Sequence, residues 1–179
     1  MTLVLLSSAG LYTSVTLLPL ALNQQAASTG LLIMLAALGW VIGAAVCGAR
    51  LAKSGYRKNA FIGMLLLTLG AFLVMPGLSH QSRYIIAGAL LMIGLGMGFA
   101  ATTTLVFTQN KVPAEHLGAW TATVQFLRNM GAALGVNALA TLQLRLSEVY
   151  AFQGCFATLG VCMLVGLVFT LWLPKGYSA

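Results

Sequence analysis

Acidic residues are almost absent from this sequence. It contains no aspartate, and Glu115 and Glu148 are its only glutamates. Charged residues of both signs make up 6% of the chain, whereas an average soluble domain has about 25%. Because so few charges cannot cover a surface in contact with water, the composition excludes an ordinary soluble protein and predicts that lipid covers much of the molecule.

Cysteine and histidine are also scarce. Cys47, Cys155 and Cys162 lie in apolar runs without metal-binding spacing, and His80 and His116 lie near the ends of such runs. We therefore expect small buried cysteines and no metal or other cofactor. An enzyme within the membrane would need a nucleophile beside a base, or a cluster of histidines and carboxylates. The apolar runs contain neither pattern, so the sequence argues against an enzyme.

Hydrophobic residues are abundant and make up 60% of the chain. Short polar segments divide them into runs near or above the ~20 residues that a helix needs to cross a bilayer. The runs are 3–22, 30–49, 60–78, 85–108, 118–144 and 154–173, and the fifth is the least apolar. We expect an all-α membrane protein in which residues 1–179 form a single bundle of about six transmembrane helices, with neighbouring helices antiparallel.

The formal net charge is +7. Nucleic-acid binding is one explanation, but the basic residues form no amphipathic or aromatic-interleaved patch, so we expect no nucleic-acid partner. The other explanation is topology, because cytoplasmic loops of membrane proteins carry an excess of lysine and arginine. With the loop after the second run in the cytoplasm, that side holds Arg50, Lys53, Arg57, Lys58, Lys111 and Lys175, and the opposite side holds Arg83 and Arg145. This predicts a multi-pass protein of the cell (plasma or inner) membrane with both termini cytoplasmic.

The basic loop has a recognisable pattern. It reads G-A-R-L-A-K-S-G-Y-R-K, which resembles the signature loop G-x-L-x-D-R-x-G-R-K of the major facilitator superfamily. Ala52 stands at the acidic position, and the loop residues that carry the resemblance are Gly48, Arg50, Lys53, Gly55, Arg57 and Lys58. The resemblance implies a latch between helices, from which Ala52 removes the anchoring acid. The alternative is a loop that sets topology and contacts anionic lipid head groups.

Two later stretches resemble the same superfamily. Gly94-Leu95-Gly96-Met97-Gly98 in the fourth run is followed by the dipeptide Val112-Pro113 and then by an R-x-x-G-x-x-x-G pattern from Arg128 to Gly135. This order is similar to the late spans of the fourteen-spanner drug/proton antiporter branch.

The resemblance implies two six-helix bundles with a substrate cavity between them, near the bilayer midplane. The chain then corresponds to the C-terminal half of a secondary transporter of the multidrug efflux type. Its implied partners are the lipid bilayer, a small amphipathic substrate and a missing N-terminal half. The alternative is a truncated remnant or an accessory membrane subunit that transports nothing.

Arg128 is the one basic residue deep inside an apolar run. It lies roughly 15 Å along its helix at 1.5 Å per residue, where an arginine costs about 2.5–3.5 kcal/mol. Thr121, Gln125 and Asn129 share its side of the helix, which predicts a polar stripe along a substrate pathway or, alternatively, structural hydrogen bonds between helices. Because arginine does not titrate, proton coupling would need a carboxylate from the missing half, and Arg128 would pair with that carboxylate or hold an anionic substrate group.

Glycines spaced four residues apart predict close helix crossings. They form the pairs Gly39–Gly43, Gly94–Gly98 and Gly131–Gly135, and Gly96 together with Gly98 also predicts a point where the fourth run can bend. Four threonines, at positions 102–104 and 108, are expected mainly to pack and to hydrogen-bond within their own helix, and the alternative is that they line the cavity.

Overall fold

The structure, a computed structural model, describes residues 2–22, 26–80, 82–145 and 151–172. Within these ranges the chain is helical and has no β-strand, so the predicted all-α class is confirmed. The elements are α1 (Thr2–Leu22), α2 (Ala26–Ser79), α3 (Arg83–Lys111), the 3₁₀ turn η1 (Ala114–His116), α4 (Leu117–Arg145) and α5 (Ala151–Thr170). The predicted end of the last run, with Lys175, and the acid Glu148 lie outside the described residues.

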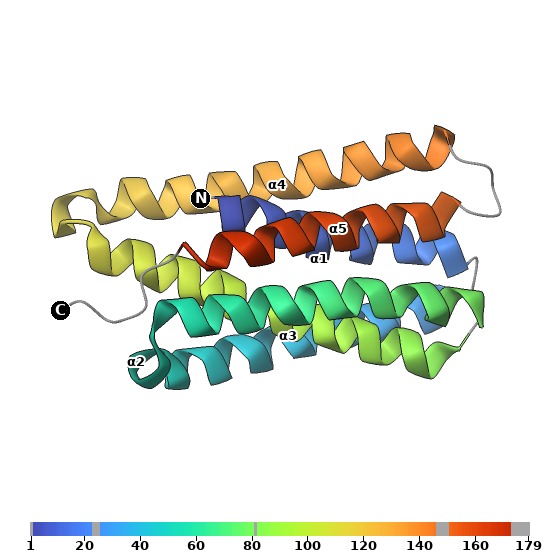
Figure 1. Cartoon of the computed structure of the whole chain (residues 1–179), viewed down its shortest axis with the longest axis horizontal. Helices are drawn as coiled ribbons and strands as arrows, with labels where there is room; N and C mark the ends of the chain where they lie inside the picture. Colours follow the sequence, from blue (N-terminus) through green and yellow to red (C-terminus); the bar gives the residue numbers. More distant parts are fainter. Residues whose placement is uncertain (1, 23–25, 81, 146–150, 173–179) are drawn as a thin grey trace.

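The second and third apolar runs lie in one long element that bends at Gly55. The sequence predicts a polar loop between these runs, whereas the structure is helical on both sides of this single residue. Gly55 has φ 72° and ψ 169°, a conformation that residues with a Cβ avoid. The bend lets the chain turn back at the left end of the bundle in Figure 1.

The connection from α3 to α4 is short because of a proline. Val112 is extended, with φ −111° and ψ 136°, as expected for the residue before Pro113, and α3 therefore ends at Lys111. This connection lies at the same end of the bundle as the α2 bend, the start of α1 and the end of α5 (Figure 1). The basic residues of the α2 bend and Lys111 thus lie at one end, and Arg83 and Arg145 at the other.

Among the described residues, three helical segments are long and apolar enough to cross a membrane: Gly30–Ser79, which contains the bend, Arg83–Lys111 and Phe152–Thr170. The α3 segment is the most enclosed, because 61% of its most apolar window is buried, against 28% for α2 and 33% for α5. The part of α1 over Thr2–Leu17 is also apolar but shorter. The least apolar of the predicted runs corresponds to α4, which is not apolar enough to be counted among these membrane-spanning segments.

Glycines let α3 lie very close to both halves of α2. A methyl group on Gly94 would overlap the backbone of Ala36, and one on Gly98 would lie 2.5 Å from the carbonyl oxygen of Trp40. On its other side, Gly96 lies against Gly63, where a methyl group would come within 2.6 Å of the Gly63 carbonyl oxygen. Such approaches allow tight van der Waals packing between helices in lipid.

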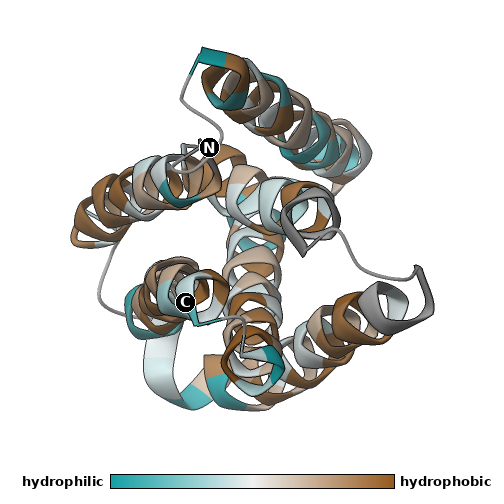
Figure 2. Ribbon diagram, turned by 90° about the vertical axis from the view of Figure 1, so that its right-hand side faces the viewer, coloured by the Kyte–Doolittle hydropathy of each residue, from teal (hydrophilic) through white to brown (hydrophobic). Residues whose placement is uncertain are grey.

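The outermost helix of the bundle is α4. Its buried residues are Val124, Gly131 and Leu139, and Gly131 lies against Leu5 of α1. Figure 2 shows hydrophilic residues recurring along this helix, at the top of the view, while the neighbouring helices are largely hydrophobic. One side of α4 therefore packs mainly on α1, with smaller contacts to α3 and α5, and the opposite side is left uncovered by this bundle.

Candidate functional site

The polar stripe predicted on the fifth run lies on α4, before the close contacts that Gly131 and Gly135 make with α1. Arg128 and Thr121 are half-buried beside the contact face that carries Val124. Gln125 and Asn129 are exposed. The structure thus leaves Arg128 and Thr121 partly covered and the other two predicted residues, Gln125 and Asn129, on the exposed surface of α4.

Arg128 is incompletely paired where it meets α1. Its Nε atom is buried and has no hydrogen-bond partner among the described residues. The guanidinium lies close enough to the Tyr12 hydroxyl of α1 to interact with it electrostatically. A buried donor without a partner costs about 1–3 kcal/mol, so this arginine is held in a position that does not satisfy its hydrogen-bonding capacity.

The uncovered surface of α4 is mixed rather than uniformly apolar. Phe126 is 65% exposed and Leu134 57% exposed, on the side of the helix away from α1. They share this surface with the exposed amides of Gln125, Asn129 and Asn137. Amide side chains facing hydrocarbon would lack partners, so this surface suits a protein or water-filled environment better than lipid.

A hollow of about 360 Å³ opens at the start of this surface, between the start of α1, the end of α3 and the start of α4. It is lined by Leu3, Val4, Thr104, Phe107, Thr108, Lys111, Val112 and Trp120. Trp120 belongs to the first turn of α4, so the hollow lies at the end of α4 where the polar stripe begins. The size lies in the range of small-molecule sites, which are mostly apolar with a few polar groups.

Trp120 is a site residue that the sequence reasoning does not single out, whereas Tyr12 belongs to a mild polar face expected on the first run. Tyr12 lies within electrostatic range of Arg128 and also lines a smaller hollow of about 160 Å³, shared with Trp40. The available signal for Trp120 was its place beside the polar stripe, since aromatic residues supply much of the surface of ligand sites. No sequence signal pairs Tyr12 with Arg128, because they are on different helices.

Most hydroxyl groups near the site bond within their own helix. The Oγ1 of Thr104 donates to the carbonyl oxygen of Ala100 at 2.7 Å, and that of Thr108 donates to Thr104 at 2.9 Å. Ser8 and Ser14 of α1 are buried and bond to backbone carbonyls one turn earlier. These groups are therefore already satisfied, although Thr104 and Thr108 also line the larger hollow.

The signature loop is fixed to α3 by Tyr56, a residue that does not carry the resemblance. Tyr56 is buried, packs edge-on against Phe107 with ring centroids 5.1 Å apart, and its hydroxyl accepts a 2.8 Å hydrogen bond from Asn110 Nδ2. At the start of the loop, a methyl group added to Gly48 would meet open space. The basic residues Arg50, Lys53 and Lys58 are exposed, and Arg57 is half-buried.

Comparison with known proteins identifies the family. All of residues 1–179 match the family model of the Major Facilitator Superfamily. The multidrug transporter protein MdtP of Bacillus subtilis (strain 168) is 25% identical over 140 residues, which are 75% of this chain and 26% of that protein. The multidrug resistance protein B homolog of Mycobacterium tuberculosis is 25% identical over 153 residues, which are 80% of this chain and 28% of that protein.

The fold is similar to a solved transporter. The xylose transporter XylE from E. coli, in an inward open conformation, superposes with a TM-score of 0.79 at 18% sequence identity, over 98% of this chain and 47% of that chain. The chain therefore spans about a quarter of the length of the two curated relatives and about half of this structure. It is a multi-pass membrane protein and belongs to the major facilitator superfamily.

Proposed function

We propose that this chain forms the C-terminal bundle of a secondary transporter that exports small amphipathic compounds, and that it works against a second, N-terminal bundle. Membership of the superfamily supports transport rather than enzymatic catalysis. Two relatives carry multidrug names, which supports an amphipathic substrate. The match to 47% of the XylE chain supports a role as one of two bundles.

The observation that carries this proposal is the position of Arg128. It lies at the edge of the surface of α4 that this bundle leaves uncovered, and its buried Nε lacks a partner among the described residues. An arginine at membrane depth must face protein or water rather than lipid. A second bundle placed against this surface would enclose Arg128, Gln125 and Asn129 within a polar pathway at the interface of the two halves.

The chemical role of Arg128 in this pathway is electrostatic. A guanidinium keeps its charge at every physiological pH, so it cannot carry the coupling proton. Glu115 is the acidic side chain within the described ranges, and it lies in η1, away from the apolar helices. The proton-carrying carboxylate of a drug/proton antiporter would therefore come from the second bundle, where Arg128 would hold its anionic form or an anionic group of the substrate.

The proposed setting is the cell membrane, with the basic end of the bundle in the cytoplasm. The basic residues of the α2 bend and Lys111 gather at that end, in agreement with the excess of positive charge on cytoplasmic loops. Both termini would then be cytoplasmic.

Dye efflux from cells tests the function directly. The chain is expressed alone and together with an N-terminal bundle taken from a related transporter, with and without Arg128→Ala. The control variant is Arg145→Ala, which removes the same side chain from the other end of α4, where it is exposed. We expect efflux only when both bundles are present, a loss of at least tenfold with Arg128→Ala, and little effect of Arg145→Ala.

A failure of efflux in every combination, with insertion of the chain verified, would favour the alternative of a remnant or accessory subunit that transports nothing. Equal losses of efflux from the two arginine variants would contradict the assignment of Arg128 to the pathway, even if transport itself were observed.

A further inference from the structure

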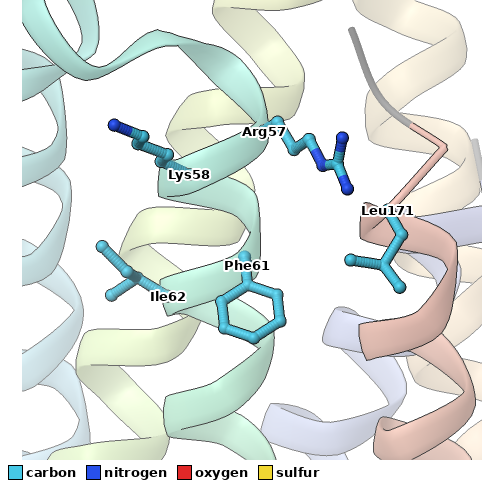
Figure 3. A pocket seen from close by; sticks show the side chains of 5 residues that line it. All are labelled: Arg57, Lys58, Phe61, Ile62 and Leu171. Carbon is cyan, nitrogen blue, oxygen red and sulfur yellow. The ribbon is translucent and has the colours of Figure 1, made fainter. Parts of the chain in front are cut away.

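An open groove of about 450 Å³ lies on the outside of the bundle, between the second half of α2 and the end of α5. It is lined by Arg57, Lys58, Phe61, Ile62 and Leu171. In Figure 3, Arg57 extends towards Leu171, Phe61 lies in the middle of the view, and Lys58 and Ile62 lie to its left on the same helix. The groove is at the basic end of the bundle, and it is separate from α4 and its polar stripe.

The lining residues are ordered by polarity along the axis of α2. The two basic residues come first, and Phe61 and Ile62 follow four positions later, which is about 6 Å deeper at 1.5 Å per residue. Leu65 and Leu69 continue the same helix face and are exposed. A charged layer therefore passes directly into a continuous apolar track, which is also the order of groups in a phospholipid.

The basic residues of the groove are not paired with an acidic residue among its described lining residues. None of its described lining residues is acidic, and the described acid Glu115 belongs to η1. Arginine can bind two phosphate oxygens with its planar fork, and lysine adds a compact charge. Charge complementarity thus favours an anion that approaches from outside the bundle.

A neighbouring tryptophan is placed as expected at the boundary between lipid and water. Trp172 directly follows Leu171, is 82% exposed and packs edge-on against Phe169. Tryptophan is enriched at the level of lipid head groups, where its ring is half in the apolar region. Its position next to Leu171 supports a phosphate at the level of Arg57 and Lys58.

We propose that this groove binds one anionic phospholipid from the surrounding leaflet. Arg57 and Lys58 hold the phosphate, and an acyl chain lies along Phe61, Ile62 and Leu171. The proposal requires only that the bundle is in a bilayer, and it does not depend on whether the chain transports a substrate.

Native mass spectrometry of the full chain, purified in detergent, tests this proposal. The chain is mixed with equal amounts of phosphatidylglycerol and phosphatidylcholine of identical acyl chains, and the ratio of the two bound forms is measured. Since each basic residue near an anionic lipid contributes about 1 kcal/mol, or roughly fivefold in affinity, we expect a preference for phosphatidylglycerol of about fivefold or more. Equal binding of the two lipids by the unmodified chain would refute the proposal.

Variants separate this groove from the general positive charge at this end. Arg57→Gln with Lys58→Gln should bring the ratio close to one. The matched control is Arg50→Gln with Lys53→Gln, which removes the same charge from exposed residues at the same end that do not line the groove. A control variant that loses the preference as completely as the groove variant would show that diffuse charge, not the groove, selects the lipid.

Two further measurements complete the test. Glycerophosphoglycerol, the head group without acyl chains, should fail to displace phosphatidylglycerol at tenfold excess; displacement would replace the lipid site with a general anion site. Circular dichroism checks the fold of each variant, and Arg57→Lys with Lys58→Arg, which keeps both charges, should retain the preference. Its loss in a folded, charge-conserving variant would contradict the assigned role of the charges.

Discussion

Gly131 of α4 lies so close to Leu5 of α1 that a methyl group on Gly131 would overlap the Leu5 carbonyl oxygen. The contact continues one turn later, where Gly135 lies against Ala9. Arg128 is on the turn before Gly131, next to the same interface. The close approach of the two backbones therefore sets how near the guanidinium comes to α1 and its Tyr12 hydroxyl.

Gly131→Ala should destabilise the bundle. The added methyl group meets backbone atoms, which cannot move aside as a flexible side chain can, so α4 must shift away from α1. Overpacking of this kind costs about 1–3 kcal/mol. The measurement is the loss of helicity in a denaturant titration in micelles, and Gly118→Ala is the control, because a methyl group there has open space on the same helix. Equal stability of the two variants would mean that the α1–α4 contact is looser than it is here.

Arg128→Leu should leave the stability unchanged or increase it, and abolish any transport. The buried Nε makes no hydrogen bond to the described residues, so its removal sacrifices no such bond and relieves a cost of about 1–3 kcal/mol. The same titration measures stability, and dye efflux measures function. This combination of outcomes is typical of residues kept for function at the expense of stability.

The control for Arg128→Leu is Gln125→Leu, which alters an exposed residue of the same stripe. A loss of more than about 2 kcal/mol on Arg128→Leu alone would point to a structural arginine bonded between helices, the alternative that the sequence leaves open.

Gly55→Ala should destabilise the bend between the two halves of α2. At φ 72° and ψ 169°, a Cβ strains the backbone by about 1–3 kcal/mol. Gly48→Ala is a well-matched control, because Gly48 belongs to the same signature loop, has no positive φ and has open space around it. If thermal unfolding gave equal midpoints for the two variants, the positive φ at Gly55 would not be required for the turn.

The helices themselves could largely be predicted from the sequence. Long apolar runs indicated where helices lie, although α3 continues to Lys111, past the predicted end of the fourth run at residue 108. The single-residue bend at Gly55 was not predicted, because a cluster of polar residues indicates a break in a span but not its length. The sequence also could not predict which apolar face of each helix is buried. Lipid is as apolar as a protein core, so the same residue type serves in both places, as exposed Leu31 and buried Leu90 show.

The sequence could predict only the part of the candidate site that lies on a single helix. Helical spacing placed Thr121, Gln125, Arg128 and Asn129 on one side of α4, and the structure adds which of them are partly buried. The approach of Tyr12 to Arg128 depends on the packing of two separate helices, which spacing along one chain segment does not determine. The role of the stripe as a substrate pathway remains a prediction.

Tyr56→Phe should weaken the attachment of the α2 bend to the end of α3. The phenol ring stays buried against Phe107, and the variant removes the 2.8 Å hydrogen bond from Asn110, which is worth about 0.5–1.5 kcal/mol. Tyr84→Phe is the control, because Tyr84 is 92% exposed and should tolerate the same change. A double-mutant cycle with Asn110→Ala isolates the pair, and unfolding titrations supply its four free energies. A coupling energy near zero would show that the ring of Tyr56, rather than its hydroxyl, holds the basic end of α2 against α3.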